Sequence, residues 1–221
     1  MAINYRNSRA EAEALAAQLG DGAAAFQADV RDPEALERLV AGVTARFGAP
    51  TTAVHNALAD YSFNGDAREK IGSLTYGHIE TQTHTAVGGA VNLAKAVHPA
   101  MKAAGFGRIV TIGTNLVQNP VVPYHDYTAA KAALMALTRT LAADLGPDGI
   151  TVNMVSGGLL RTTAASAATP EAVFDLIAAS TPLRRVTTPA EAADAVLFFA
   201  SPWARSVTGQ NLMVDGGLVF G

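Results

Sequence analysis

The sequence contains no cysteine among its 221 residues. Disulfide bonds, cysteine nucleophiles and cysteine metal ligands are therefore excluded, and this composition is typical of a cytoplasmic protein. Charged residues make up only 16% of the chain, and the formal net charge is −3. Without a basic run the chain lacks the positive surface that nucleic-acid binding requires, so we expect no nucleic-acid partner.

Long hydrophobic runs are also missing, although 49% of the residues are hydrophobic. No stretch approaches the roughly 20 apolar residues of a membrane-spanning helix, and the first residues do not form a signal-peptide core. We therefore expect no membrane partner. The chain is long enough for one sizeable hydrophobic core. Without a repeat or a low-complexity linker, it predicts a single domain over residues 1–221.

Two further types of site lack their sequence patterns. The five histidines never recur at the H-x-x-x-H spacing that would place two metal ligands on one helix face. No G-x-S-x-G nucleophile elbow is present. The sequence thus predicts neither a metal centre nor a serine hydrolase.

What the sequence does contain is an alternation of short apolar strands and helices. Strand patterns occur in the runs AINY, AAAFQADV, TTAVHN, RIVTIG, ITVNMV and NLMVDG, and helical patterns separate them. Apolar strands that alternate with helices are typical of a parallel sheet with helices on both faces. The predicted fold class is therefore α/β, with a doubly wound parallel sheet.

One stretch, Thr111–Lys131, concentrates polar groups at a strand end. RIVTIG has the pattern of a buried strand that ends at Gly113, and the hydroxyl of Thr114 follows directly. Tyr127 and Lys131 stand four residues apart at the start of an Ala/Leu-rich helix, so they share one face. Ligands bind at the carboxyl ends of strands in open α/β sheets. A hydroxyl, a phenol and an ammonium can therefore converge at such a site.

These three groups together suit proton transfer to or from an oxygen. A tyrosine phenol titrates near ~10, and a cation a few ångströms away favours the phenolate, so Lys131 is expected to lower the pKa of Tyr127. Such a phenol can exchange a proton during carbonyl–alcohol interconversion while Thr114 hydrogen-bonds the same oxygen. The simpler alternative is an ordinary exposed pair of residues on one helix face.

The order of the motifs TIGT, Y-x-x-x-K, ITVNMVSGG and TGQNLMVDGG resembles the short-chain dehydrogenase/reductase family. The closest likeness is to 3-oxoacyl-[acyl-carrier-protein] reductases, and it extends from Ile3 to Gly217. The resemblance implies a Rossmann-type fold and a nicotinamide cofactor. It implies that Tyr127 donates or accepts the proton, and that Lys131 lowers its pKa and binds the ribose. Thr114 stands where the family usually has serine.

The resemblance also implies cofactor contacts at strand ends. Arg6 follows the first strand, where an arginine suits the 2′-phosphate of NADP(H), so NADP(H) is the expected cofactor; a solvated surface arginine is the alternative. Asp29 and Val30 match the family's adenine contact, although a plain turn aspartate remains an alternative. The other matching positions are Asn56, Ala57, Gly158 and Thr162.

One departure from the family concerns the long helix that precedes RIVTIG. The family usually has an asparagine there, which binds a water that relays protons to the lysine. That position aligns with Ala86. We expect Thr85 or His84 to compensate only if the helix shifts.

A second departure concerns the start of the chain, which resembles the family's second strand. The first strand, its Gly-rich turn and the first helix have no counterpart. In the family order 3-2-1-4-5-6-7 that first strand is central. We favour the interpretation that the sequence is an incomplete record. The alternative is a repaired fold, in which Ala2–Asn4 pair directly with Thr52–Asn56 or a partner lends a strand. We also expect that the 221-residue chain alone does not bind NADP(H) productively.

The predicted function is hydride transfer between NADP(H) and a ketone, either a 3-oxoacyl thioester or a similar compound. The alternative is a catalytically silent relative that acts as an assembly or binding partner, which Ala86 and the missing segment favour. Family members typically form tetramers through the two long helices. The Ala/Gly/Leu faces of those helices in this sequence predict a homotetramer.

Overall fold

The computed structural model describes residues 1–58, 63 and 68–220. All strand pairings in it are parallel. The strands are β1 (Ala2–Tyr5), β2 (Ala24–Gln27), β3 (Thr52–His55), β4 (Gly107–Thr114), β5 (Ile150–Gly157) and β6 (Asn211–Val214). The helices are α1 (Arg9–Leu19), α2 (Pro33–Phe47), α3 (Tyr76–Thr83), α4 (Gly89–Ala104), α5 (His125–Leu145), α6 (Glu171–Ser180) and α7 (Pro189–Ala200). Each predicted strand is present, so the alternating apolar pattern located them correctly.

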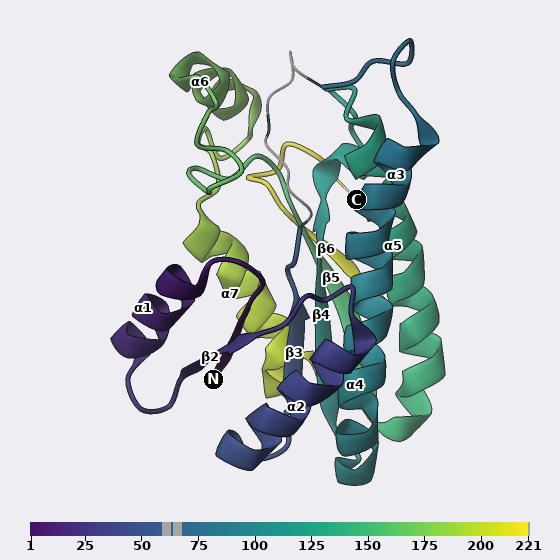
Figure 1. The fold of residues 1–221 in the computed structure, drawn as a ribbon. Helices are drawn as coiled ribbons and strands as arrows, with labels where there is room; N and C mark the ends of the chain where they lie inside the picture. Colours follow the sequence, from purple (N-terminus) through teal and green to yellow (C-terminus); the bar gives the residue numbers. More distant parts are fainter. Residues whose placement is uncertain (59–62, 64–67, 221) are drawn as a thin grey trace.

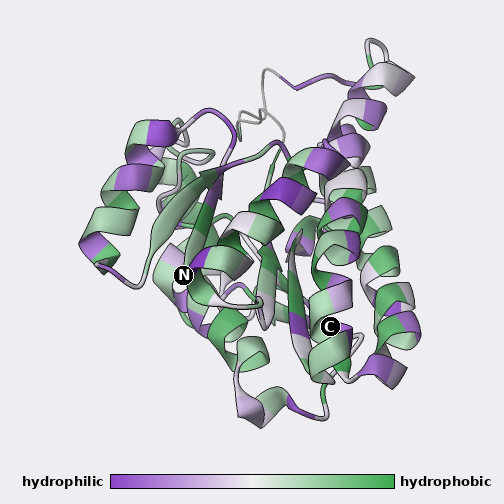
Figure 2. Ribbon diagram, turned by 60° about the horizontal axis from the view of Figure 1, so that its bottom comes forward, coloured by the Kyte–Doolittle hydropathy of each residue, from purple (hydrophilic) through white to green (hydrophobic). Residues whose placement is uncertain are grey.

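Helices cover both faces of the parallel strands, which confirms the predicted α/β class (Figure 1). On one face, Ile109 and Val152 pack against α4 and α5. On the other face, Val110 and Val155 pack against α7. Hydrophobic and hydrophilic residues alternate around the helices, as expected for helices that bury one side against a sheet (Figure 2). No helix of the described residues is long and apolar enough to cross a membrane.

The strands form two sheets, β1-β2 and β3-β4-β5-β6. The alternative in which Ala2–Asn4 pair directly with Thr52–Asn56 is therefore wrong. The carbonyl of Met1 accepts from the backbone N of Ala24, and that of Thr51 accepts from the backbone N of Arg108. Along a strand of a parallel ladder, the backbone N–H and C=O groups of successive residues point alternately toward the partner strand and away from it. The backbone groups of Ala2 and Asn4, and of Thr52 and Val54, therefore point away from their partner strands.

Helices and side chains, and not a shared ladder, connect the two sheets. Asn92 on α4 donates a hydrogen bond from Nδ2 to the carbonyl of Val30, just after β2, at 3.0 Å. A Cβ built on Gly89 would lie 2.8 Å from Val30 Cγ2 and 2.9 Å from His55 Cε1. Glycine at this position therefore lets α4 approach the carboxyl ends of β2 and β3 together.

The long helix predicted before RIVTIG is interrupted. A π-helical turn, η2 (His84–Gly88), separates α3 from α4. Such turns insert an extra residue and shift the helix faces, and they are frequent at functional sites.

Helix α2 has a regular capped start. The Asp32 carboxylate accepts hydrogen bonds from the backbone N of Glu34 and Ala35, at 3.0 and 3.1 Å.

Candidate active site

Strand β4 and helix α5 bring Thr114, Tyr127 and Lys131 together, as predicted. Tyr127 and Lys131 lie on the buried face of α5, 6% and 5% exposed, and Thr114 ends β4 at 6%. Thr111 Oγ1 on β4 hydrogen-bonds Thr138 Oγ1 on α5 at 2.8 Å. This buried hydrogen bond helps to hold the helix against the strand that carries Thr114.

The three side chains are oriented by short-range contacts. The Thr114 hydroxyl hydrogen-bonds the Tyr127 phenol, and Thr114 Oγ1 accepts from the backbone N of Leu116 at 3.3 Å. Lys131 Nζ lies 5.7 Å from the centroid of the Tyr127 ring. Its ammonium donates to the carbonyl of Ile112 at 2.7 Å. The hydroxyl, phenol and ammonium thus occupy one site at the end of β4.

The pKa values differ from the sequence expectation. Burial raises the pKa of Tyr127 to about 12, although the hydrogen bond from Thr114 opposes this change. Burial also lowers the pKa of Lys131 to about 8. The predicted lowering of the Tyr127 pKa is therefore not what the structure gives, because desolvation outweighs the hydrogen bond and the ammonium is directed to Ile112. At neutral pH the phenol carries its proton, which suits a proton donor.

The predicted adenosine contacts gather where β1 and β2 end. Arg31, which the sequence reasoning missed, binds the Asp29 carboxylate through Nε at 3.0 Å and through Nη2 at 2.5 Å. The pKa of Asp29 is lowered to about 2, chiefly by this hydrogen bond and in smaller part by the charge of Arg6. Two guanidinium groups therefore stand near one carboxylate. The signal in the sequence was the spacing of Asp29 and Arg31, which are two residues apart and so lie close enough to form this ion pair.

The structure places the other predicted contacts at neighbouring strand ends. Val30 is buried and packs with the partly buried Ala57, whereas Asn56 is exposed at the end of β3. Gly158 follows β5, and a Cβ there would lie 3.1 Å from Asn115 Nδ2. Thr162 is exposed in the loop after β5.

A buried polar contact near Gly158 was not predicted. Asn115 Nδ2 donates to Asp215 Oδ2 at 3.0 Å, and both residues are buried. The Asp215 carboxylate also accepts hydrogen bonds from the backbone N of Gly217, Leu218 and Val219. The VDGG motif after β6 thus ties the C-terminal segment to the end of β4.

Aromatic and aliphatic side chains surround the Tyr127 ring. The ring of Phe63 meets that of Tyr127 edge-on, with centroids 5.8 Å apart, and Leu116 and Tyr124 belong to the same cluster. Next to them Arg68 forms an ion pair with the buried Asp126. The site therefore presents an apolar wall with one charged pair beside it.

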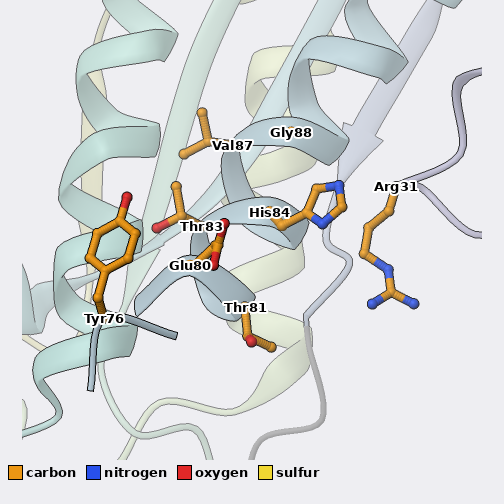
Figure 3. Close-up of a pocket in the computed structure, with 8 residues that line it drawn as sticks. All are labelled: Arg31, Tyr76, Glu80, Thr81, Thr83, His84, Val87 and Gly88. Carbon is orange, nitrogen blue, oxygen red and sulfur yellow. The ribbon is translucent and has the colours of Figure 1, made fainter. Parts of the chain in front are cut away.

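A cavity of about 550 Å³ is lined by residues of α3 and η2 and by Arg31. Figure 3 shows His84 projecting toward Arg31 within this cavity, with Tyr76, Glu80 and Thr83 also lining it. Thr114, Tyr127 and Lys131 are not among the residues that line it. The cavity is therefore separate from the catalytic groups, and His84 faces it instead of the site.

Known proteins share this arrangement of elements. Residues 1–219 match the family model described as Enoyl-(Acyl carrier protein) reductase. The chain is 34% identical over 206 residues to the (2S)-[(R)-hydroxy(phenyl)methyl]succinyl-CoA dehydrogenase subunit BbsC of Thauera aromatica, covering 92% of this chain and 78% of that protein. It is 30% identical over 217 residues to 3-oxoacyl-[acyl-carrier-protein] reductase FabG of Escherichia coli, covering 98% and 86%. A solved gluconate 5-dehydrogenase from Burkholderia cenocepacia, in complex with NADP and tartrate, is 28% identical with a TM-score of 0.86, covering 98% and 84%.

Proposed function

Because this chain belongs to the short-chain dehydrogenase/reductase family of oxidoreductases, we propose that it uses NADP(H) to interconvert a ketone and a secondary alcohol. The substrate class is a small-molecule or acyl-carrier-linked ketone, such as a 3-oxoacyl thioester. The observation that carries the proposal is the convergence of Thr114, Tyr127 and Lys131 at the end of β4.

In the reduction, Thr114 and Tyr127 act on the ketone oxygen. Thr114 donates a hydrogen bond that orients the carbonyl, and Tyr127 gives its phenolic proton to the oxygen as negative charge develops there. The raised pKa of Tyr127 keeps this proton in place at neutral pH. Lys131 then stabilises the tyrosinate through its nearby positive charge.

The residues at the ends of β1 and β2 fit a phosphorylated cofactor. Arg6 and Arg31 bring two guanidinium groups to this edge, which suits an anionic 2′-phosphate. Asp29, Val30, Asn56, Ala57, Gly158 and Thr162 would complete the binding surface, and Tyr127 and Lys131 would meet the ribose. A bound nicotinamide cofactor would supply the hydride.

Substituting the phenol tests the reaction. Tyr127→Phe removes one hydroxyl, so we expect NADPH-dependent ketone reduction to fall at least about 100-fold, in line with general acid catalysis. Circular dichroism should show an unchanged fold. Tyr124→Phe is the matched control, because Tyr124 is equally buried in the same cluster. Full activity of Tyr127→Phe would show that another group supplies the proton.

Substituting Arg6 tests the cofactor. We expect NADPH to bind at least about tenfold tighter than NADH, because a charge-assisted contact to the 2′-phosphate is worth more than that factor. Arg6→Ala should remove the preference, as measured by cofactor fluorescence titration. Arg9→Ala is the control, because Arg9 pairs with Glu13 on the exposed face of α1. Equal affinities in the wild type would refute the role of Arg6.

A second candidate is a catalytically silent member that serves as a binding partner. The separation of β1 from β3 favours it, because the adenosine and catalytic residues then stand on different sheets. In that case no ketone is turned over and NADPH fluorescence does not change on mixing with the protein.

We also propose a homotetramer. Leu197 on α7 and Trp203 after it are 65% and 82% exposed, and large exposed apolar side chains of this kind are typical of interfaces. Light scattering at micromolar concentration tests this assembly, and a mass near 22.7 kDa would contradict it.

A further inference from the structure

A second cavity, of about 270 Å³, lies at the amino ends of β4 and β5. These two strands run side by side (Figure 1), and Gly107 is opposite Ile150 where they begin. Arg108 and Thr114 are six residues apart on β4, which places the cavity roughly 20 Å from the catalytic groups at about 3.3 Å per residue. None of the residues that line it is among the predicted catalytic or cofactor contacts. The cavity is therefore distinct from the proposed active site.

The cavity is lined by a buried arginine that has no counter-ion in the part of the chain that the structure describes. Arg108 is 4% exposed. Its Nη1 donates to the carbonyl of Gly107 at 2.8 Å, and its guanidinium carbon lies 4.2 Å from the centroid of the Phe106 ring. Among the described residues, its Nε and Nη2 have no hydrogen-bond partner and no carboxylate pairs with it.

The charge of this arginine persists at pH 7. Burial lowers the pKa of Arg108 below its ordinary value, but a guanidinium stays protonated in proteins. Charged side chains are almost never fully buried unless they are paired. The charge of Arg108 therefore points to an anion that binds from outside the chain.

Thr151 on β5 adds a hydroxyl next to Arg108. The two residues are opposite each other in the sheet, and by strand alternation they lie on the same face as Val110 and Val155. Within the described ranges, Thr151 Oγ1 and Arg108 Nε are both buried side-chain atoms without a hydrogen-bond partner. Such atoms are rare in native proteins and are usually satisfied by ordered water or an ion. Two of them on adjacent strands, in residues that line one cavity, indicate a site for a polar ligand.

The segment after the short helix η5 (Pro202–Ala204) also lines the cavity and brings further donors. Arg205 contributes a second guanidinium, which is exposed, and Ser206 and Thr208 contribute hydroxyls. Thr208 Oγ1 accepts from the backbone N of Val152 at 3.0 Å, so its own hydrogen remains available to a ligand. This hydrogen bond also ties the segment to β5, beside Arg108 and Thr151.

Among the described residues, no acidic side chain lines this cavity. Asp148 lies in the chain between the lining residues Gly146 and Gly149, but its carboxylate is occupied by His98 Nε2 at 2.7 Å and by Lys102 Nζ at 3.1 Å. The guanidinium groups are therefore not neutralised by a competing carboxylate of the cavity. Guanidinium groups match the geometry of phosphate and carboxylate oxygens, and hydrogen bonds between charged partners are the strongest ones in proteins.

We propose that this cavity binds a small phosphate-bearing anion, which Arg108 and Arg205 hold with Ser206 and Thr208 as further donors. A phosphate group presents three strong acceptor oxygens and up to two negative charges, which suits these four side chains better than the two oxygens of a carboxylate. The volume of about 270 Å³ lies just below the roughly 300 Å³ at which small-molecule sites begin. The ligand is therefore free phosphate or a small phosphorylated compound.

The first test follows the Nε–H signal of Arg108 by ¹H–¹⁵N NMR while inorganic phosphate is added. We expect this signal and the backbone amides of Gly149 and Ser206 to shift and to saturate, with a dissociation constant of about 1 mM, because charge-assisted contacts offset the freedom lost on binding. Sodium chloride at the same ionic strength is the control and should leave these signals in place. A phosphate titration that shifts none of them would overturn the proposal.

The second test removes the exposed guanidinium. Arg205→Gln should leave the fold intact and raise the dissociation constant for phosphate at least about tenfold, as expected for the loss of a charge-assisted hydrogen bond. Arg139→Gln is the matched control, because Arg139 is exposed on α5 and does not line this cavity. Equal phosphate affinities of wild type and Arg205→Gln would contradict the proposed site.

Arg6→Ala separates this cavity from the predicted contact to the 2′-phosphate of NADP(H). The variant should keep the phosphate-dependent shift of the Arg108 Nε–H, because Arg6 follows β1 in the other sheet. Loss of the shift would place the phosphate at the predicted cofactor edge and overturn the proposal.

A titration with glycerol 3-phosphate identifies the source of the phosphate group. Tighter binding than that of inorganic phosphate supports a phosphorylated compound as the ligand, and equal or weaker binding supports free phosphate. None of these measurements involves ketone reduction, so they decide on this site whether or not the proposed function holds.

Discussion

Burial of the Lys131 ammonium predicts that replacing Lys131 stabilises the fold at neutral pH. Burial lowers its pKa from 10.5 to about 8, and the side chain is 5% exposed. The unfolded chain therefore holds this proton more tightly than the folded chain. This difference lowers the free energy of unfolding. The loss is fully present below pH 8 and disappears as the pH rises toward 10.5. The difference between the two pKa values corresponds to about 3 kcal/mol.

Lys131→Met removes this penalty and also removes the hydrogen bond to the carbonyl of Ile112. That bond contributes about 1.5–3 kcal/mol because its donor is charged. We therefore expect the variant to be at least as stable as the wild type at pH 7, by up to about 1.5 kcal/mol. At pH 10 this advantage should be lost, because the lysine of the folded chain is then neutral and less than about 1 kcal/mol of the penalty remains.

The assay is urea unfolding of wild type and Lys131→Met at pH 7 and pH 10. The pKa of Tyr127 is raised to about 12. Its contribution to the free energy of unfolding therefore stays constant up to its ordinary pKa of 10, so Tyr127 does not affect the comparison between pH 7 and pH 10. Lys95→Met is the control, because Lys95 is exposed on α4. A Lys131→Met variant that is less stable than the wild type at pH 7, or that keeps the wild-type pH dependence, would refute the reasoning.

Three further predictions concern the surroundings of this site. The pKa of His55 is lowered to about 4, so the free energy of unfolding of the wild type should fall by about 3 kcal/mol between pH 6.5 and pH 4. In urea unfolding, the free energy of unfolding of His55→Gln should fall by less over the same range. Gly89→Ala should cost about 1–3 kcal/mol, since the new methyl would meet Val30 and His55, whereas Gly22→Ala meets no atom within 4 Å and should be near neutral. Arg31→Ala should return the pKa of Asp29 from about 2 toward its ordinary value, which carboxyl NMR can follow; an unchanged value would exclude Arg31 as the cause.

Local sequence patterns were sufficient to locate the strands and the catalytic face of α5. The apolar runs at β4 and β5 are continuous because both faces of these strands are covered, and the four-residue spacing placed Tyr127 and Lys131 together. The cap at Asp32 was equally predictable, since its Asp-Pro pair is a strong start signal for a helix. These features depend on neighbours in the chain, so the sequence alone reports them.

Features that depend on distant packing were not predictable in the same way. Nothing in the run HTAVG distinguishes a π-helical turn from an α-helix, yet this turn buries Thr85 and turns His84 outward. The pKa of Tyr127 depends on how completely the phenol is desolvated, which a spacing argument does not contain. The sheet division likewise follows from which strands meet in space.

The two halves of the proposed site stand on different sheets, and this division constrains how they work together. Thr114, Tyr127 and Lys131 depend on the four-stranded sheet, whereas Arg6 and Asp29 follow strands of the two-stranded sheet. Because β1 and β3 share no ladder, their relative position depends on contacts through α4, at Asn92 and Gly89. Isolated two-stranded units are marginal without packing, so β1 and β2 should exchange their backbone amides faster than β4 and β5. Tight cofactor binding should slow that exchange, since one ligand that contacts both halves stabilises the arrangement that α4 holds.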